Sequence, residues 1–169
     1  MRETIRFAWG TSSLGDFVVA VSDSGIVALE FSAMRTAMED ALRARFPDAA
    51  LDHRPQELAG MIDILAGAID DPARPCDLPL DLRGTPYEVQ VWRMLQGIPA
   101  GQTTNYGTLA AQLGSRDPRE VTAAIASNPI ALIVPCHRVI KKDGSISGYR
   151  WGVRRKQALL ARERRVAAE

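Results

Sequence analysis

The sequence predicts a mixed α/β fold (α/β or α+β) in two domains. Residues 1–84 form a small α/β domain, and residues 85–169 form a winged helix-turn-helix domain. Three observations predict this division. Short β-prone runs and two amphipathic helical patterns fill the first part. A stretch with four prolines, "DDPARPCDLPLDLRGTP", separates the parts. Two short helical patterns around a glycine turn, followed by an Asp-Gly turn between β-prone arms, are typical of a winged helix.

The first domain is predicted to begin with strands and continue with helices. "IRFAWG" at 5–10 and the two halves of 15–31 read as strands, because apolar residues flank a Ser-Asp-Ser-Gly turn. Residues 34–46 follow as a helix, since Met34, Met38, Leu42 and Phe46 repeat every four positions until Pro47. Residues 55–70 are predicted to form a second helix.

The second domain begins with a helix that Thr85 caps and Pro86 opens. Residues 103–114 and 115–129 are predicted as the two helices of the helix-turn-helix, and 130–135 as an apolar strand. The segment "VIKKDGSISGY" is the predicted wing. A last helix over 152–165 buries Val153, Ala158 and Leu159 or Leu160 and presents a basic face.

Composition limits the kind of protein. With 169 residues, 46% hydrophobic and 24% charged, the chain is typical of a soluble protein with a proper core. No signal peptide or membrane-spanning run is present, so a cytoplasmic location is expected. Cys76, Cys136, His53 and His137 have no zinc-ligand spacing, and we expect neither a metal nor a cofactor.

Charge is distributed unevenly along the chain. Through Gly84 there are 8 Lys/Arg and 14 Asp/Glu, a balance of −6, whereas the remainder has 13 and 6, a balance of +7. The second domain is therefore the part that is expected to bind a polyanion such as a nucleic acid.

Cys136 lies between Pro135 and His137. The simplest interpretation is structural, because most buried cysteines act as small hydrophobic residues without chemistry. In an extended segment the side chains of Cys136 and His137 point apart, so a water is expected to relay the thiol proton to the imidazole. A carboxylate beyond the imidazole would hold its tautomer. The residues alone leave that choice open, although we favour Glu163 among the carboxylates of this half: Glu88, Asp117, Glu120, Asp143, Glu163 and Glu169. Pattern alone is equally compatible with a winged helix that only binds DNA.

The motif "PCHRVI" at Pro135–Ile140 resembles the active-site motif of the O6-alkylguanine-DNA alkyltransferase family. "RGTPYEVQVW" and "RRKQALLARE" extend the resemblance, and "SGYRWGVRRKQALL" is similar to the C-terminal domain of Ada-type proteins. The resemblance implies an RNase H-like first domain. It also implies a protein that transfers an alkyl group, once per molecule, from O6-alkylguanine in double-stranded DNA to Cys136.

The resemblance assigns roles to individual residues. Cys136 is the acceptor, His137 its base through water, and Glu163 the orienting carboxylate. Asn128 ties the helix-turn-helix to the active-site segment, and Tyr106 crowds the target phosphate and helps to protonate the departing guanine. The expected DNA contacts are Arg119, which fills the space of a flipped nucleotide, together with Tyr106, Thr122 and Arg138. The expected pocket residues are Val139, Tyr149, Arg150, Trp151, Ala131 and Ile125.

Some features depart from the family pattern. Glu120 and Thr122 stand where the family commonly has small residues, and the zinc ligands of some relatives are missing. The expected partner is double-stranded DNA bound by a monomer, without a membrane, and O4-alkylthymine is left open as a second substrate. The rival functions are a non-catalytic winged-helix lesion sensor or transcription regulator and a cysteine hydrolase; adjacency of Cys136 and His137 is unfavourable for the hydrolase.

Overall fold

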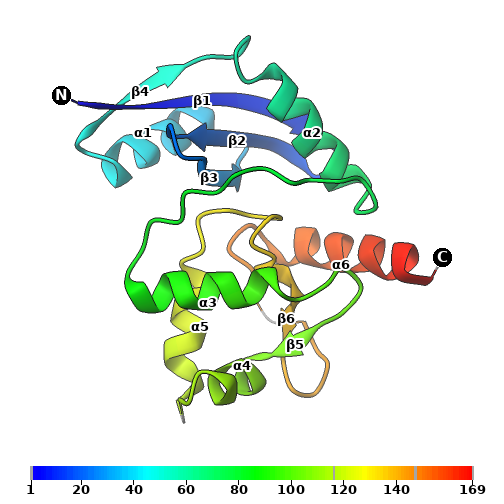
Figure 1. The fold of residues 1–169 in the computed structure, drawn as a ribbon. Coiled ribbons are helices and arrows are strands. Elements are labelled where there is room, and N and C mark those ends of the chain that lie inside the picture. The colour runs from blue at the N-terminus through cyan, green and yellow to red at the C-terminus, as the bar shows by residue number, and fades with distance from the viewer. Residues whose placement is uncertain (1, 116, 147, 169) are drawn as a thin grey trace. The chain divides into compact units, whose positions relative to one another are not determined.

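Four strands in the order β3-β2-β1-β4 form the sheet of the N-terminal part of the chain. The computed structural model describes residues 2–115, 117–146 and 148–168. Within it, residues up to Leu82 form one compact unit and residues from Arg83 onward form another (Figure 1).

The sheet combines antiparallel and parallel pairing. β1 (Glu3–Ser12), β2 (Gly15–Val21) and β3 (Ile26–Phe31) pair antiparallel with their sequence neighbours. Helix α1 (Arg35–Arg45) then crosses over, so that β4 (Ala49–His53) pairs parallel to β1. α2 (Ala59–Asp70) completes the unit.

A helix packs against each face of this sheet. Leu42 of α1 joins the core formed by Ile5, Phe7 and their neighbours on one face. The opposite face carries Gly10, where a Cβ would lie 2.7 Å from Cγ2 of Ile62 in α2. Gly10 therefore permits the close approach of α2.

Strand β4 was not predicted from the sequence. Its segment "AALDH" has a low content of β-branched and aromatic residues, so only pairing with β1 specifies its conformation. The helix expected over 55–70 begins at Ala59, and Met34 is 70% exposed at the N-terminus of α1 rather than part of the core.

Part of the proline-rich segment is bound to the first unit. The Ile26 amide donates to the Pro79 carbonyl (2.9 Å), and the Asp81 amide donates to the Ile26 carbonyl (2.8 Å). Gly25 has a φ of 152°, and a Cβ there would lie 2.6 Å from the Pro79 oxygen. This part of the segment is thus fixed by backbone hydrogen bonds.

The second unit is built around α3 (Pro86–Gln96) and α5 (Pro118–Ala126). Thr85 and Glu88 form a capping box at the start of α3. The buried Trp92 indole donates to the Ala124 carbonyl of α5 at 2.8 Å. This bond fixes α3 against the helix that leads to the candidate site.

The other elements of this unit are short, apart from the last helix. β5 (Thr104–Asn105) leads into α4 (Tyr106–Gln112), which precedes α5. η1 (Cys136–Arg138) leads into β6 (Val139–Ile140), which pairs parallel with β5. α6 (Val153–Ala168) ends the described chain.

The structure of this unit differs from two of the expectations drawn from the sequence. The segment 130–135 forms turns rather than a strand. The predicted wing contains the expected turn at Asp143-Gly144, in which the Lys141 amide donates to the Ser145 carbonyl. Ser147, within the predicted wing, lies outside the described residues. The buried residues of α6 are Lys156, Leu159, Leu160 and Glu163, whereas Val153 is 41% exposed. The expected inward position of Val153 was wrong because the buried stripe begins one turn later.

Candidate active site

The chain reaches Cys136 through two tight turns. Leu132 has a φ of 68°, a left-handed conformation that costs a bulky residue about 1–3 kcal/mol. Pro135, with φ −82° and ψ 64°, is the centre of an inverse γ-turn in which the Cys136 amide donates to the Val134 carbonyl (2.8 Å). Cys136 therefore begins a 3₁₀ turn and does not lie in the extended segment expected from the sequence.

Asn128 stabilises these turns from the end of α5. Its buried side-chain amide donates to the carbonyls of Ile130 (3.1 Å) and Val134 (2.9 Å), and its carbonyl accepts from the Ile130 amide (2.9 Å). One side chain thus joins α5 to the backbone just before Cys136.

Cys136 itself is buried, with 5% of its surface exposed. Burial raises the pKa of its thiol to about 11, while the Asn128 amide and the positive charges of Lys156 and Arg150 act in the opposite direction. The sulfur is therefore a protonated thiol at neutral pH, in surroundings that favour its anion once the proton has been removed.

His137 and Glu163 form a buried pair. Nε2 of His137 lies 2.9 Å from Oε2 of Glu163. Burial lowers the pKa of His137, and hydrogen bonds from His137 and Arg138 lower the pKa of Glu163 to about 2, against the effect of its burial. A neutral imidazole then donates from Nε2 to the carboxylate and keeps a lone pair at Nδ1. Among the described residues Nδ1 is buried without a hydrogen-bond partner.

Arg138 faces the same carboxylate. Its Nη2 lies 2.7 Å from Oε2 of Glu163 and its Nε lies 3.0 Å from Oε1, while Nη1 donates to the Ile98 carbonyl. With 15% of its side chain exposed, Arg138 is directed inward. The guanidinium compensates a buried carboxylate, and the expected DNA contact of Arg138 stays a prediction.

Lys156 is a site residue that the sequence interpretation missed. It is 1% exposed, and its Nζ donates to the carbonyls of Val139 (2.7 Å) and Gly148 (3.5 Å). Burial lowers its pKa. The signal was available in the spacing of positions 156, 159, 160 and 163, which places Lys156 and Glu163 on the same helix face as two buried leucines.

A pocket of about 510 Å³ opens beside Cys136. Six of the expected site residues line it: Tyr106, Thr122, Ile125, Cys136, Tyr149 and Arg150. Ala126, Lys141 and Gly148 also line it, and Lys141 was not expected there. The pocket is large enough for more than the alkyl group alone.

Three expected pocket residues are not among those that line it. Val139 and Ala131 are fully buried, and Trp151 is 6% exposed with its ring 5.2 Å from that of Tyr149 in an edge-on arrangement. Trp151 thus packs against a pocket residue. Burial raises the pKa of the Tyr149 hydroxyl, which has no hydrogen-bond partner among the described residues.

The remaining expected DNA contacts lie on or near α5. Arg119 is 90% exposed, and its guanidinium pairs with Asp117 through Nε (3.0 Å to Oδ1) and Nη2 (3.0 Å to Oδ2). Asp117 also caps α5, accepting from the Arg119 amide at 2.9 Å. The Thr122 hydroxyl donates to the Pro118 carbonyl (2.7 Å).

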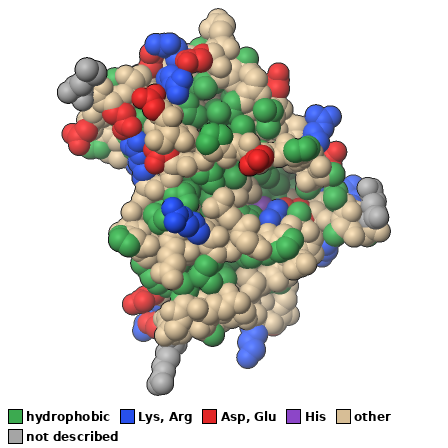
Figure 2. Space-filling model, viewed as in Figure 1, with side chains coloured by type: hydrophobic (Ala, Val, Ile, Leu, Met, Phe, Trp, Pro, Cys, Tyr) green, Lys and Arg blue, Asp and Glu red, His purple; other side chains and the backbone are tan. Residues whose placement is uncertain are grey.

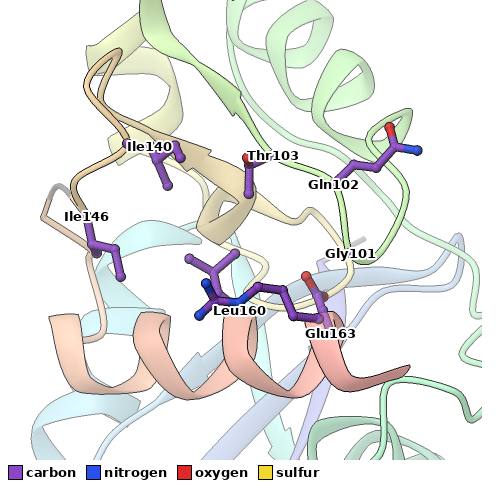
Figure 3. A pocket seen from close by; sticks show the side chains of 9 residues that line it. Gly101, Gln102, Thr103, Ile140, Ile146, Leu160 and Glu163 are labelled. Carbon is purple, nitrogen blue, oxygen red and sulfur yellow. The ribbon is translucent and has the colours of Figure 1, made fainter. Parts of the chain in front are cut away.

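A separate pocket of about 200 Å³ lies against α6. Figure 3 shows the side chains of Ile140 and Leu160 directed into it, with Glu163 from the same helix as Leu160. Cys136 is not among its lining residues.

Two further searches of the described residues concern metals and membranes. They hold no cluster of three or more His, Cys, Asp or Glu side chains placed to bind a metal ion. None of their helices is long and apolar enough to span a lipid bilayer.

Comparison with known proteins finds relatives over most of the chain. A family described as "6-O-methylguanine DNA methyltransferase, DNA binding domain" matches residues 86–165. The bifunctional transcriptional activator/DNA repair enzyme Ada of Escherichia coli is 40% identical over 162 residues, which cover 94% of this chain and 45% of that protein. A methylated-DNA–protein-cysteine methyltransferase of Mycolicibacterium paratuberculosis is 46% identical over 112 residues, which cover 66% of this chain and 68% of that protein.

The chain spans about half the length of the Ada proteins it matches. Among solved structures, Mycobacterium tuberculosis OGT in complex with DNA has a TM-score of 0.78 and 34% identity, covering 95% of this chain and 93% of that chain. This likeness confirms the mixed α/β fold predicted from the sequence.

Proposed function

The chain belongs to the methylated-DNA–protein-cysteine methyltransferase family, and we propose that it repairs double-stranded DNA by transferring the alkyl group of an O6-alkylguanine to its own Cys136. The transfer is irreversible, happens once per molecule and needs no cofactor. The observation that carries the proposal is Cys136 in a pocket next to a neutral His137 whose imidazole is oriented by Glu163.

The reaction begins with removal of the thiol proton. A water between Sγ of Cys136 and Nδ1 of His137 passes the proton to the imidazole, and Glu163 stabilises the imidazolium that forms. The sulfur then attacks the alkyl carbon, an S–C bond forms, and the bond from that carbon to O6 breaks. Its electron pair goes to the guanine, which Tyr106 at the pocket wall helps to protonate.

The buried sulfur requires a flipped base. A stacked guanine cannot present its alkyl carbon to a sulfur inside a pocket, and extrusion costs a few kcal/mol. Arg119 is exposed at the start of α5, and we propose that its side chain enters the duplex and fills the space left by the flipped nucleotide. Thr122 on the same helix contacts the DNA near the flipped nucleotide.

The domain assignment follows the family. We assign residues 1–84 to an RNase H-like domain, which the strand order β3-β2-β1-β4 with a crossover helix supports. Residues 85–169 form the winged helix-turn-helix domain, with α4 and α5 as its two helices. The protein acts as a monomer on one lesion.

Intact-mass measurement tests the proposed function. After incubation with a duplex that contains one O6-methylguanine, the protein is expected to gain the mass of one methyl group, on the peptide that contains Cys136. Cys136→Ala is expected to remain unmodified, and Cys76→Ala is the matched control that still reacts. Multiple turnover, or a methyl group on Cys76, would contradict the proposal.

A further inference from the structure

His137 and Arg138 share one carboxylate oxygen. Oε2 of Glu163 lies 2.9 Å from Nε2 of the imidazole and 2.7 Å from Nη2 of the guanidinium. Nε of Arg138 also lies 3.0 Å from Oε1, so the guanidinium engages both oxygens of the carboxylate. The carboxylate that orients the imidazole is thus bound at the same time by a permanent cation.

The main chain fixes Arg138 in this position. Its Nη1 donates to the carbonyl of Ile98, which follows the end of α3, and 15% of its side chain is exposed. The Ile98 carbonyl carries no net charge. This third contact therefore orients the guanidinium, while Glu163 remains its counter-charge.

A carboxylate this close to an imidazole normally favours the imidazolium, because a nearby opposite charge raises the pKa of a histidine. A protonated His137 carries hydrogens on both ring nitrogens, so its Nδ1 has no lone pair to accept the thiol proton. The carboxylate that must stabilise the imidazolium during the reaction would then disable the base before the reaction starts.

The charged groups that act on His137 come from two elements. Glu163 and Lys156 belong to α6, and Arg138 belongs to η1 itself. Burial is the main cause that lowers the pKa of His137; the carboxylate raises this pKa, and the two cations lower it. α3 also packs against η1, but its ionisable residues are not among the groups that act on this imidazole: Tyr87, Glu88 and Arg93.

We propose that Arg138 is a positioning residue that keeps the His137 imidazole neutral by binding its carboxylate partner, Glu163. The inference rests on the proposed function, in which the imidazole must be free to accept the thiol proton. In the resting protein the guanidinium and the carboxylate compensate one another, and the imidazole stays uncharged with its lone pair at Nδ1. When the thiol proton reaches Nδ1, the imidazolium is stabilised by Oε2, which already accepts the Nε2 hydrogen.

The protonation of His137 can be measured directly, because the chain has two histidines, His53 and His137. In a His53→Gln protein without a histidine tag, the imidazole signals of a nitrogen-15 NMR titration come from His137. The shifts of the two ring nitrogens report which of them carries a proton. We expect a neutral ring at pH 7, protonated at Nε2. A ring that is already charged at pH 7 overturns the proposal without any further variant.

Arg138→Gln removes the cation and leaves Glu163 without its compensation. The pKa of His137 is expected to rise by at least about one unit. Because methyl transfer requires the neutral imidazole, the single-turnover rate falls as the pH drops through this pKa, and the midpoint of that fall is expected to move upward by the same amount. The variant is therefore expected to be about tenfold slower at pH values below its midpoint and to recover at higher pH. A purely structural defect would slow transfer equally at every pH.

Two further variants separate the charge from its hydrogen bonds. Arg138→Lys keeps a cation without the planar fork, and the pKa of His137 is expected to stay near its wild-type value even where the rate falls. A rise in Arg138→Lys as large as the one expected for Arg138→Gln would overturn the role of the charge. Arg164→Gln is the matched control: it removes an exposed charge next to Glu163, where solvent screens it, and is expected to leave the pKa unchanged.

The NMR titration needs no DNA, so it distinguishes this inference from the proposed function. Methyl transfer by the wild type together with an unchanged pKa of His137 in Arg138→Gln overturns only this inference. Failure of the wild type to transfer methyl, with the rise in the pKa of His137 present in Arg138→Gln, overturns only the proposed function.

Discussion

At the scale of single residues, the reactivity proposed for Cys136 depends on its neighbours. Burial raises the pKa of its thiol to about 11, so the thiolate is scarce at neutral pH. His137 is also kept neutral by burial, and Glu163 fixes which of its nitrogens carries the proton. The proton can therefore be removed at the moment of attack rather than before it.

Glu163→Gln tests this arrangement. The substitution keeps the shape of the side chain but removes the charge that stabilises an imidazolium and compensates Arg138. We expect methyl transfer to slow about 10- to 100-fold, measured as a single-turnover rate on an O6-methylguanine duplex. An unchanged rate would show that His137 does not accept the thiol proton.

Acid is expected to destabilise the fold through the same pair. The pKa of His137 is lowered in the folded state, so its contribution to stability is complete above the unfolded value of about 6.5 and declines below it. Glu163, with a pKa of about 2, adds a second decline from about pH 4.5 down to about 2. Urea unfolding is expected to show a loss of about 1 kcal/mol between pH 7.5 and pH 5.5. His137→Asn is expected to lack that loss, and an equal loss in both proteins would exclude His137 as its source.

Arg119→Ala separates base flipping from chemistry. Repair of duplex DNA is expected to slow at least tenfold, because the flipped state loses the side chain that fills the vacated space. The reaction with free O6-methylguanine needs no flipping and is expected to change much less. Rates on both substrates decide this, and equal losses would assign Arg119 another role.

Cys136, His137 and Glu163 were predictable from the family motif, whereas the inward position of Arg138 and the buried Lys156 were not predicted. "PCHRVI" and the closing helix lead to Cys136, His137 and Glu163, which the structure brings together. Arg138 was expected to contact DNA, and the structure shows that it also forms a salt bridge with the buried Glu163 carboxylate. Lys156 was missed although its spacing from Leu159, Leu160 and Glu163 places it on the buried face of α6, because lysine is rarely buried in proteins.

At the scale of elements, hydrogen bonds join the end of α5 to the turns of residues 130–135 that precede Cys136. Asn128 is the connection, with three hydrogen bonds to a backbone that contains a left-handed Leu132. These bonds hold the turns that precede Cys136.

Asn128→Ala is expected to destabilise the protein by about 2–4 kcal/mol, because it leaves buried carbonyl and amide groups unpaired. Methyl transfer is expected to slow as well. Asn128→Asp keeps the acceptor for the Ile130 amide but places a buried carboxylate against two carbonyl oxygens. It is therefore expected to lose at least as much stability in denaturant titration as Asn128→Ala. A fully stable Asn128→Ala would contradict the role of this connection.

Helices were predicted well in this chain because their signals are local. α3, with its Thr85 cap and Pro86, and α5, entered through Asp117 and Pro118, both follow their sequence signals. The segments that failed depend on distant partners: β4 on its pairing with β1, and residues 130–135 on the Asn128 amide. An apolar run such as "IALIVP" suits a strand or a buried turn equally, and only the tertiary contact decides.

At the scale of the whole chain, charge divides into an acidic and a basic half. The first 84 residues have a balance of −6 and the remainder +7. Figure 2 shows acidic and basic side chains interspersed on one face of the N-terminal unit. Pairs such as Arg43–Asp40 within this unit compensate one another. The N-terminal unit therefore has little net attraction for DNA.

DNA binding is expected to reflect this division in its dependence on salt. Lys142→Gln, in the exposed turn of the second unit, is expected to reduce the slope of log K against log salt by up to about 0.9, the contribution of one phosphate contact. Arg43→Gln removes an exposed charge from the first unit and is expected to leave the slope unchanged. Fluorescence anisotropy on an undamaged duplex measures both, and equal changes would contradict the division.

With the role proposed for Arg119, its pair with Asp117 is expected to affect how the protein searches undamaged DNA. Asp117 accepts from the backbone amide of Arg119 as well as from its guanidinium, so α5 keeps its cap when the side chain swings away. Detaching an exposed pair of this kind costs about 0–1 kcal/mol, which is small beside the cost of extruding a base. At a normal base pair, the Arg119 side chain can thus leave Asp117 and return to it without disturbing α5. Salt weakens this pair and the phosphate contacts together, so a rise in ionic strength shortens each visit to DNA while making Arg119 easier to release.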